Sequence, residues 1–596
     1  MSDYVAPLKD MQFVLTELAG LDEVAKLPGC EDVSVELVEQ ILEESGKFCA
    51  EVLSPLNQSG DAEGSKWDQG KVTTPKGFIA AYKQFVEGGW NALQFPPEFG
   101  GQGLPKLVAT PVMEMWKAAN MSFSLCPLLT GGAIEALLLS GTDKLKQTFL
   151  PKMVEGSWTG TMNLTEPQAG SDLALVKSKA VREGEHYRIT GQKIFITYGE
   201  HDLAENIVHL VLARTPDAPE GVKGISLFVV PKFLVNADGS LGKRNDVQCV
   251  SIEHKLGIHA SPTAVLIYGE HEGAIGYLVG EENKGLAYMF IMMNAARFAV
   301  GLEGTAISER AYQLALAYAK ERVQSRDLAG GAKAVPIIRH PDVRRMLMSM
   351  KAQTEAMRAL AYVTAAAMDI AHSDPDKALR AKHQAFADMM IPVVKGWSTE
   401  TCIEVASIGI QVHGGMGYVE ETGAAQLLRD ARITTIYEGT TAIQANDLVG
   451  RKLAREGGAT AKEVIKAMRV VEGELAQAQG EDMAAIRARL AAGITAVEEC
   501  VSWIVATYSE DIKAVHAGSV PFLKLMGVVC GGWQMARAAL VSQKKLASKD
   551  GDAGFYQAKI ATARFYADHI LAQAPGLRDT VVRGAAGVMA LSEEQF

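Results

Sequence analysis

The chain has 596 residues, enough for about three to five domains. Hydrophobic residues make up 48% of the chain and charged residues 22%, a composition that is typical of globular proteins and excludes disorder for most of the length. The formal net charge is −11, from 59 Lys plus Arg against 70 Asp plus Glu, so nucleic acid is not the expected partner.

The cysteines and the N-terminus bear on the cellular compartment. Seven cysteines without a C-x-x-C pair argue against a disulfide framework and against a zinc site, and they fit a reducing compartment. The first residues, MSDYVAPLKDMQF, lack the apolar core of a secretory signal. The apolar stretch 224–235 is too short to span a bilayer. We therefore expect a soluble, intracellular protein without membrane insertion and without a bound metal.

The first 150 residues predict helices. From Leu37 to Leu53 apolar residues recur at intervals of three and four, which places them on one face of a helix. We expect that helix to end before Pro55, because the residue preceding a proline avoids the helical region. The loop 94–104 is rich in Pro and Gly. The long apolar segment 118–140 that follows is best interpreted as a pair of buried core helices.

From about Thr159 the sequence pattern changes to that of strands. The runs 187–190 and 193–197 flank Gly191-Gln192, which predicts a hairpin turn. Three further β-rich runs are short and bounded by turn residues: 208–213, 225–230 and 264–268. Together these features predict a β domain of about 120 residues with antiparallel character.

Helical patterns return near Gly285. The segment that begins at His340-Pro341 runs to about Ala371 without another Gly or Pro, and a proline suits the first turn of a helix. Beyond the two glycines 457–458 further helices are expected, including 461–479. The predicted order is therefore helical, β, helical and an additional helical tail, which is a multidomain α+β fold.

Four segments stand out as possible carriers of chemistry, whereas a P-loop, an H-E-x-x-H sequence and a nucleophile elbow are missing from the sequence. The segments are Thr161–Leu173 (TMNLTEPQAGSDL), Gly191–Gly199 (GQKIFITYG), Gln411–Tyr418 (QVHGGMGY) and Leu428–Gln444 (LRDARITTIYEGTTAIQ). They resemble the signature segments of the acyl-CoA dehydrogenase family of flavoenzymes. The early segment 4–18 and the long tail resemble a subgroup of larger bacterial members, which includes 3-methylmercaptopropionyl-CoA dehydrogenases.

This resemblance implies an organisation in five parts and a bacterial cytoplasmic location. The expected parts are an N-terminal helical extension (1–34), an N-terminal helical domain (35–158), a middle antiparallel β domain (159–282), a C-terminal helical bundle (283–457) and an additional helical domain (458–596).

The resemblance also implies a reaction, the FAD-dependent α,β-dehydrogenation of an acyl-CoA thioester to the trans-2-enoyl-CoA. Such a desaturation needs a base for the α-proton and an acceptor for the β-hydride, and a flavin must accept the hydride because no side chain does. Glu438 in Tyr437–Thr440 (YEGT) matches the family's base, with FAD N5 as acceptor. Burial against the acyl chain would raise the pKa of Glu438. Some relatives carry the base immediately before a characteristic arginine; here that position is Ala296, before Arg297.

The same resemblance implies a flavin site. Leu164 and Thr165 match residues that hold the isoalloxazine ring, and Thr197 matches the residue that bonds near flavin N5. Phe195 stands where relatives often have tryptophan, which keeps stacking and loses an N–H donor. Arg322 matches a pyrophosphate ligand that reaches the neighbouring subunit's FAD. The full predicted FAD set is Met162, Leu164, Thr165, Gly170, Ser171, Phe195, Thr197, Arg322, Ser325, Gln411, Gly414, Gly415 and Thr440.

Substrate contacts are implied in the same way. The backbone N–H of Glu438 would help to polarise the thioester, where enolate charge develops. For Arg297 an internal salt bridge is the alternative to a CoA contact, and His413 is better interpreted as a core histidine than as a ligand. Ala442 stands where glutamine is common, which leaves the contacts to the CoA adenosine open. The predicted substrate set is Ser171, Asn294, Arg297, Tyr437, Glu438, Gly439 and Arg451.

Several functions remain open at this point. The leading one is a dehydrogenase that passes electrons from a fatty acyl-CoA or from 3-methylmercaptopropionyl-CoA to an electron-transfer flavoprotein. An acyl-CoA oxidase on the same fold would return the electrons to oxygen instead. A nucleic-acid-binding relative would need a basic surface that the acidic composition disfavours. A flavin-free helical scaffold is the fourth possibility.

The tail after residue 459 is too apolar to be a solvated appendage. Its large apolar residues are Trp503, Ile504, Tyr508, Phe522, Leu523, Leu525 and Met526. We expect it to pack intramolecularly over the surface that shorter relatives use for tetramer contacts, which predicts a homodimer with no catalytic residue in the tail. The alternative is that it docks on the N-terminal helices near the acyl pocket.

Overall fold

The computed structural model describes residues 4–549 and 551–596 and divides into two compact units. The β unit comprises Lys47–Leu104 and Ala119–Ala299, and the helical unit comprises Met1–Gly46, Pro105–Ala118 and Val300–Phe596. The long helix α9 (Gly285–Glu321) begins in the first unit and continues into the second.

The centre of the β unit is a sheet in the order β10-β11-β5-β12-β7-β6-β3, with β4 added beside β5. Its strands are β3 (Trp158–Asn163), β4 (Lys179–Glu183), β5 (His186–Thr197), β6 (Asn206–Ala213), β7 (Ser226–Pro231), β10 (Val247–Ile252), β11 (Thr263–Tyr268) and β12 (Ala274–Leu278). Neighbouring strands of this sheet run antiparallel, apart from the parallel pair β3 and β6. The predicted antiparallel β domain is therefore confirmed, with one parallel pair that the sequence pattern did not indicate. Short strand pairs accompany the sheet: β1 (Lys66–Asp68) with β2 (Lys71–Thr73), and β8 (Phe233–Val235) with β9 (Leu241–Arg244).

Two apolar cores lie on opposite faces of this sheet. Strand β6 is buried along its whole length, and its side chains alternate between the two cores as the pleat requires. Val208 and Leu210 join one core with Leu137 and Phe149, which come from helices, whereas Val211 joins the other core. Burial on both faces explains why β6 reads as a continuous apolar run.

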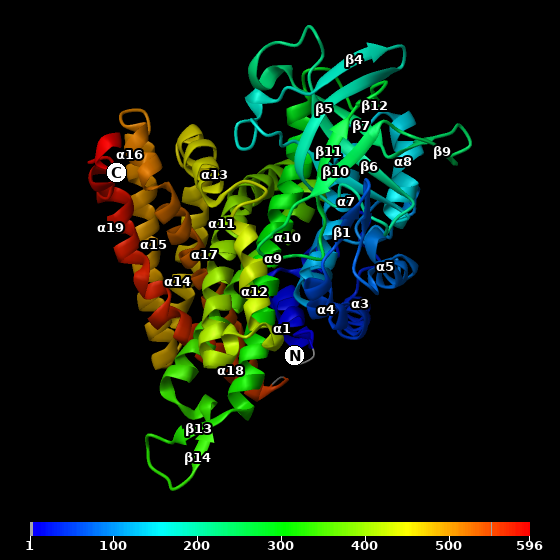
Figure 1. The fold of residues 1–596 in the computed structure, drawn as a ribbon. Coiled ribbons are helices and arrows are strands. Elements are labelled where there is room, and N and C mark those ends of the chain that lie inside the picture. The colour runs from blue at the N-terminus through cyan, green and yellow to red at the C-terminus, as the bar shows by residue number, and fades with distance from the viewer. Residues whose placement is uncertain (1–3, 550) are drawn as a thin grey trace. The chain divides into compact units, whose positions relative to one another are not determined.

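Helices α7 (Met121–Ser140) and α8 (Asp143–Glu155) contribute side chains to the first of these cores. The β unit also contains α4 (Pro55–Glu63) and α5 (Phe78–Glu87). Helix α7 begins at Asn120, whose side chain accepts a hydrogen bond from the Phe123 N–H at 3.1 Å, a standard N-cap. Helices α7 and α8 both contact β3, and Figure 1 labels both helices beside strands of the sheet. The apolar segment predicted as a pair of helices is thus essentially one helix.

The predicted hairpin at Gly191-Gln192 is wrong. Strand β5 runs unbroken from His186 to Thr197. Its first half pairs with β4 and β12 and its second half with β11. Gly191 is needed there for space, because a Cβ on it would lie 2.3 Å from the Ser178 Oγ, and its φ of 143° is unfavourable for other residues. The glycine therefore marks a close backbone approach within a strand.

The helical unit is built around α9, α10 (Pro341–Ser373) and α11 (Lys377–His413). Its first part contributes α1 (Leu8–Phe13), η1 (Val14–Leu18), α2 (Leu21–Val24), most of α3 (Val35–Phe48) and α6 (Lys106–Ala119). Between α9 and α10 lies an exposed hairpin of β13 (Val323–Arg326) and β14 (Ala334–Pro336). After α11 come η8 (Gly414–Tyr418), α12 (Ala424–Ala431), η10 (Arg432–Thr435), α13 (Thr441–Asn446) and η11 (Asp447–Leu453). The predicted helix that begins at Pro341 is confirmed, with proline in its first turn.

The described residues of the tail form helices that pack inside the helical unit, in orange and red in Figure 1. They are α14 (Ala459–Gln477), α15 (Glu481–Thr507), α16 (Ile512–Ala517), α17 (Ser519–Ser548), α18 (Ala553–His569) and α19 (Ala574–Arg583), followed by the short α20 (Ala585–Val588). Helix α17 contacts α10, α11 and α13, and the tail residues Phe522, Leu523 and Met526 are buried there. The predicted intramolecular packing is confirmed.

A cluster of buried charges joins the first helix, the bundle and the tail. Arg358 on α10 donates hydrogen bonds to Glu114 at 2.7 Å, to Glu309 at 2.7 Å and to Asp10 at 2.5 Å. Lys559 on α18 binds the other oxygen of Asp10. Burial raises the pKa of Asp10, but the charges of Lys559 and Arg358 outweigh this effect and hold that pKa well below its usual range. The N-terminal extension is thereby fixed between the bundle and the tail.

Three helices within the described residues are long and apolar enough, by length and composition, to cross a membrane: Met121–Ser140, Gly285–Glu321 and Glu481–Thr507. Between 44% and 72% of the most apolar window of each is buried inside the structure. All seven cysteines are buried, and none of them forms a disulfide.

Candidate functional site

In the β unit, the predicted flavin residues lie on two neighbouring backbone segments. The Ile194 N–H donates to the Thr165 carbonyl at 2.9 Å, which fastens the segment after β3 to β5. Met162, Leu164 and Thr165 are half-buried on the first segment, and Thr197 is half-buried on the second. The fold therefore brings these four predicted residues together.

Phe195 differs from its neighbours in exposure and in backbone conformation. Its side chain is 59% exposed, and its φ of 59° is rare for an aromatic residue. An aromatic ring that is held at the surface by an unfavourable backbone conformation suits stacking against a planar ligand. This feature, with the half-exposed hydroxyls of Thr165 and Thr197 beside it in the same pair of segments, fits an isoalloxazine ring.

Glu166 closes the loop that carries Gly170 and Ser171. Its buried carboxylate accepts hydrogen bonds from the Lys177 N–H at 2.7 Å, from the Ser178 N–H at 3.1 Å and from Lys193 Nζ at 2.8 Å. Burial raises the pKa of Glu166, but the Lys193 charge and these hydrogen bonds outweigh it and lower that pKa to about 2. Gly170 and Ser171 are left exposed at the tip of the loop, with nothing within 4 Å of a Cβ placed on Gly170.

Two buried histidines that contact β3 were not predicted from the sequence. His209 Nδ1 lies 2.7 Å from Thr161 Oγ1, and His201 Nε2 lies 2.9 Å from Thr159 Oγ1. Burial lowers the pKa of each histidine to about 3, so both are neutral at physiological pH. A network of this kind fixes the strand from which the flavin segment continues.

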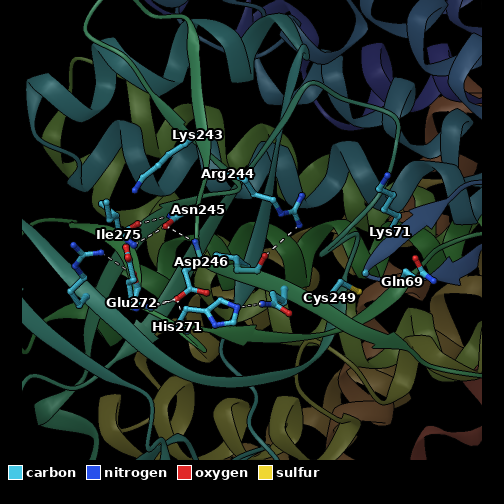
Figure 2. Close-up of a pocket in the computed structure, with 15 residues that line it drawn as sticks. Gln69, Lys71, Lys243, Arg244, Asn245, Asp246, Cys249, His271, Glu272 and Ile275 are labelled. Carbon is cyan, nitrogen blue, oxygen red and sulfur yellow. Dashed lines mark hydrogen bonds between the residues drawn. The ribbon is translucent and has the colours of Figure 1, made fainter.

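Figure 2 shows a cavity in the β unit with a volume of about 510 Å³. Its lining includes four basic residues, Lys71, Lys243, Arg244 and His271, together with acidic and neutral ones. Asp246 is engaged there by the N–H groups of residues 271–273. The predicted site residues are not among those that line this cavity.

In the helical unit, Glu438 lies in the short loop between η10 and α13. It is half-buried and has a left-handed backbone, with φ 54°, and Gly439 follows with φ 86°. The positive φ of Gly439 disfavours any other residue, and a Cβ there would also lie 2.7 Å from Gln444 Nε2. Thr440 then starts α13, and its Oγ1 accepts from the Ile443 N–H at 3.3 Å. The sequence Glu-Gly-Thr thus encodes a tight turn into a helix.

Buried polar groups surround this loop, and sequence reasoning missed most of them. Lys395 Nζ donates to the Gly439 carbonyl at 2.7 Å, and Tyr437 donates its hydroxyl hydrogen to Glu303. Burial lowers the pKa of Lys117, the counter-ion of Glu303, to about 8. The sequence does contain one indication of this network: Glu303 is a charged residue within the apolar run FAVGLEGTAIS.

The remaining predicted residues divide between exposed and buried positions. Arg322 and Ser325 lie on the exposed hairpin after α9, and Gln411, Gly414 and Gly415 lie exposed at the end of α11. Asn294 is exposed on α9, whereas Arg297 on the same helix is buried. Arg451 is exposed and pairs with Asp447 at 3.5 Å. His413 is buried, with Nδ1 at 2.7 Å from the Gly409 carbonyl, which confirms its interpretation as a core histidine.

No group of three or more His, Cys, Asp or Glu side chains able to hold a metal ion occurs within residues 4–549 and 551–596.

Comparisons with known proteins cover nearly the whole chain. Sequence profiles match for the acyl-CoA dehydrogenase N-terminal domain (residues 36–157), middle domain (161–269) and C-terminal domain (283–453), and for an acetyl-CoA dehydrogenase C-terminal-like domain (460–592). The chain is 53% identical over 572 residues to a 3-methylmercaptopropionyl-CoA dehydrogenase of Ruegeria pomeroyi, which covers 96% of both chains. It is 36% identical over 594 residues to a butyryl-CoA dehydrogenase of Syntrophomonas wolfei, covering 97% and 96%.

A solved structure supports the fold. The acyl-CoA dehydrogenase of Bacillus anthracis, complexed with FAD, matches with a TM-score of 0.74 at 22% identity, covering 96% of this chain and 92% of that one.

Proposed function

Since this chain belongs to the acyl-CoA dehydrogenase family, we propose that Glu438 is the base that removes the α-proton of its acyl-CoA substrate. The protein is an FAD-dependent oxidoreductase that dehydrogenates acyl-CoA thioesters. Bound FAD supplies the acceptor for the β-hydride. The observation that carries the proposal for Glu438 is its backbone: a half-buried carboxylate in a left-handed turn that Gly439 makes possible.

The residues around Glu438 would bind and orient the thioester. Gly439 has no side chain, so an acyl group can approach the backbone closely there. The N–H of Glu438 would donate to the thioester carbonyl, and this stabilises the negative charge that develops on the oxygen as the α-proton leaves. Ser171, Asn294, Arg297, Tyr437 and Arg451 remain proposed substrate contacts.

The β-unit residues would hold the flavin. Leu164, Thr165 and Thr197 would bind the polar edge of the ring system, and Phe195 would stack on it. Met162, Gly170, Ser171 and Thr440 complete the proposed set within one chain. The exposed Phe195 ring and the adjacent hydroxyls support this assignment.

We propose a short, unbranched acyl group as the substrate. The relative at 53% identity is named for 3-methylmercaptopropionyl-CoA and the one at 36% for butyryl-CoA, and both acyl groups are short and linear. A pocket that binds one should accept the other, because a hydrophobic pocket discriminates weakly between groups of similar size.

We further propose a homodimer in which Arg322, Ser325, Gln411, Gly414 and Gly415 complete the FAD site of the partner subunit. All five are exposed, and apolar neighbours of η8 are exposed with them: Met416, Tyr418 and Val419. Such a combination of apolar and polar groups is typical of an interface.

The five-part domain division and a location in the bacterial cytoplasm also remain proposals.

An electron-transfer flavoprotein is the proposed electron acceptor, and oxygen is the alternative. The test is an anaerobic titration of the bound flavin with butyryl-CoA, 3-methylmercaptopropionyl-CoA and longer acyl-CoA thioesters, followed by exposure to air. Flavin bleaching by the short thioesters and slow reoxidation in air are expected. Fast reoxidation would identify an oxidase, and no bleaching by any thioester would refute the proposed reaction.

A further inference from the structure

The loop that carries Glu438 is anchored at the residues on both sides of it. Gln444 Nε2 donates to the carbonyl of Glu438 at 3.1 Å and to that of Gly439 at 3.3 Å. Lys395 Nζ donates to the Gly439 carbonyl at 2.7 Å. On the other side, the Tyr437 hydroxyl donates to Glu303 Oε2. The backbone of Glu438 is therefore held between a buried lysine and a buried carboxylate.

Glu303 is a surprising residue at its position. It lies on α9 among apolar neighbours and is completely buried. Its other oxygen, Oε1, lies 3.9 Å from Lys117 Nζ on α6, which is also buried. Burial raises the pKa of Glu303, and Lys117, the Tyr437 hydrogen bond and Lys395 oppose that effect. A buried charge of this kind is costly unless it is paired, so its presence calls for a function.

Close helix packing places Glu303 and Lys395 near the same loop. A Cβ on Gly304 would lie 2.5 Å from the Ser398 carbonyl oxygen, and one on Gly301 would lie 2.7 Å from Val394 Cγ1. The glycines on either side of Glu303 therefore bring α9 against α11 at the level of Lys395. Any larger residue at these positions would move Glu303 away from Tyr437.

Glu438 itself needs such restraint. A left-handed backbone is unfavourable for a glutamate and persists only where surrounding contacts impose it. Tyr437 immediately precedes it, so fixing the tyrosine side chain limits the backbone rotations that would release the turn. A small displacement of a catalytic group slows proton transfer strongly, because the reaction depends on near-attack geometry.

We propose that Glu303 is a positioning residue for proton abstraction: it binds the Tyr437 hydroxyl, with Lys117 as its counter-ion, and so fixes the backbone from which Glu438 reaches the α-proton. This inference rests on the proposed function, in which Glu438 is the base. Glu303 does not take the proton itself, because it is fully buried and the Tyr437 hydroxyl occupies one of its oxygens.

The test is a double-mutant cycle with Tyr437→Phe and Glu303→Gln. Both changes nearly keep the shape of the side chain: Tyr437→Phe removes the hydrogen-bond donor, and Glu303→Gln removes the negative charge that strengthens the bond. The rate of flavin reduction by butyryl-CoA is measured anaerobically under single-turnover conditions and normalised to bound FAD. We expect each single variant to reduce the flavin about tenfold more slowly and the double variant no more slowly than the slower single one, since both changes act on the same contact. The dissociation constant for butyryl-CoA should stay within about twofold in the Glu303→Gln enzyme, because Glu303 is not among the proposed substrate contacts.

A kinetic isotope effect separates positioning from general loss of stability. With butyryl-CoA deuterated at the α-carbon, the isotope effect on flavin reduction should rise in the Glu303→Gln enzyme, because proton abstraction has become slower. Glu309→Gln is the matched control: it makes the same change on the same helix, at a buried carboxylate that pairs with Arg358 instead. This control should lower the melting temperature and leave the rate of flavin reduction unchanged.

Three results would overturn the inference: wild-type flavin reduction by Glu303→Gln, single effects that multiply in the double variant, or equal slowing by Glu309→Gln. Failure of the proposed function is recognised separately, because Glu438→Gln would then reduce its flavin at the normal rate. If Glu303→Gln lowers the yield of folded protein, Tyr437→Phe alone supplies the isotope effect, and an unchanged value there contradicts the role of the hydrogen bond.

Discussion

Gly527 and Trp397 are in direct backbone-to-ring contact: a Cβ on Gly527 would lie 2.0 Å from Trp397 Cγ. The glycine belongs to tail helix α17 and the tryptophan to α11, two residues beyond Lys395. Leu523, one turn earlier on α17, packs over Gly396 in the same way. The tail is thus seated on the helix that supports the loop of the proposed base.

Gly527→Ala should destabilise the helical unit strongly. The added methyl group cannot be accommodated without moving Trp397, which is nearly fully buried, so we expect a loss of at least about 1–3 kcal/mol. Gly473→Ala is the control, because nothing lies within 4 Å of a Cβ at that position of α14. Thermal unfolding of the two variants measures the difference. Equal melting temperatures would show that the tail does not pack on α11 as described.

Glu438→Gln should bind FAD and fail to use it. The substitution keeps the shape of the side chain and removes its capacity to accept a proton. We expect flavin reduction by butyryl-CoA to fall by at least about 10³-fold while the flavin absorption spectrum stays unchanged. Stopped-flow measurement under anaerobic conditions tests this expectation, and near-normal reduction would eliminate Glu438 as the base.

Arg322→Ala should weaken FAD retention if this arginine reaches the partner's cofactor. A charge-assisted hydrogen bond to phosphate is lost, which we expect to raise the FAD dissociation constant by about tenfold or more. Arg326→Ala, at the other end of β13, provides a control on the same exposed hairpin. Unchanged FAD content in the Arg322 variant after dialysis would count against the assignment.

Light scattering should give a mass of about two chains for the intact protein, because the tail covers part of the bundle and the exposed α11 end remains for one interface. A stable tetramer would refute the covering role of the tail. A fully active monomer would refute the shared FAD site.

The pH dependence of stability should report on Glu166. Its pKa is lowered to about 2 in the folded protein, against about 4.5 for an unperturbed glutamate, so the folded state binds this proton less readily than the unfolded chain. The stabilisation is therefore present above pH 4.5 and is lost as the pH falls from about 4.5 to about 2, on the order of 1–3 kcal/mol.

Glu166→Gln should remove that part of the acid dependence and leave Lys193 without its charge partner, with a loss of about 3 kcal/mol at neutral pH. Urea unfolding of both proteins between pH 3 and pH 7 provides the comparison. Parallel stability curves for the variant and the wild type would show that the ion pair does not act as described.

The sequence predicted the parts of this fold whose signals are local. Pro341 marks the start of α10 in its own first turn, and the strand-rich section after Thr159 is evident from its composition. The predicted turn at Gly191 was wrong, because the sequence alone does not distinguish a glycine inside a strand from a glycine in a turn. Its pairing partner Tyr268 and its close neighbour Ser178 lie elsewhere in the chain, so the sequence around Gly191 does not reveal them.

The candidate site also consists of residues with local sequence signals and residues without them. The residues from Tyr437 to Thr440 form one short motif that can be recognised in the sequence. Glu303, in contrast, is 134 residues away from Tyr437, its hydrogen-bond partner. Lys117 is still more distant in sequence. Only packing of α6, α9 and α11 brings such groups together, so a buried network of this kind becomes visible in three dimensions alone.

The buried contact of Asp10 with Lys559 joins residues that are 549 positions apart. During synthesis, Lys559 leaves the ribosome 549 residues after Asp10. The contact of α1 with α18 therefore forms only after the intervening residues have been made, whereas Arg358 on α10 can bind Asp10 earlier. Until α17 has been made, the part of α10 that α17 contacts stays uncovered, and exposed apolar surface of this kind favours aggregation of incomplete chains.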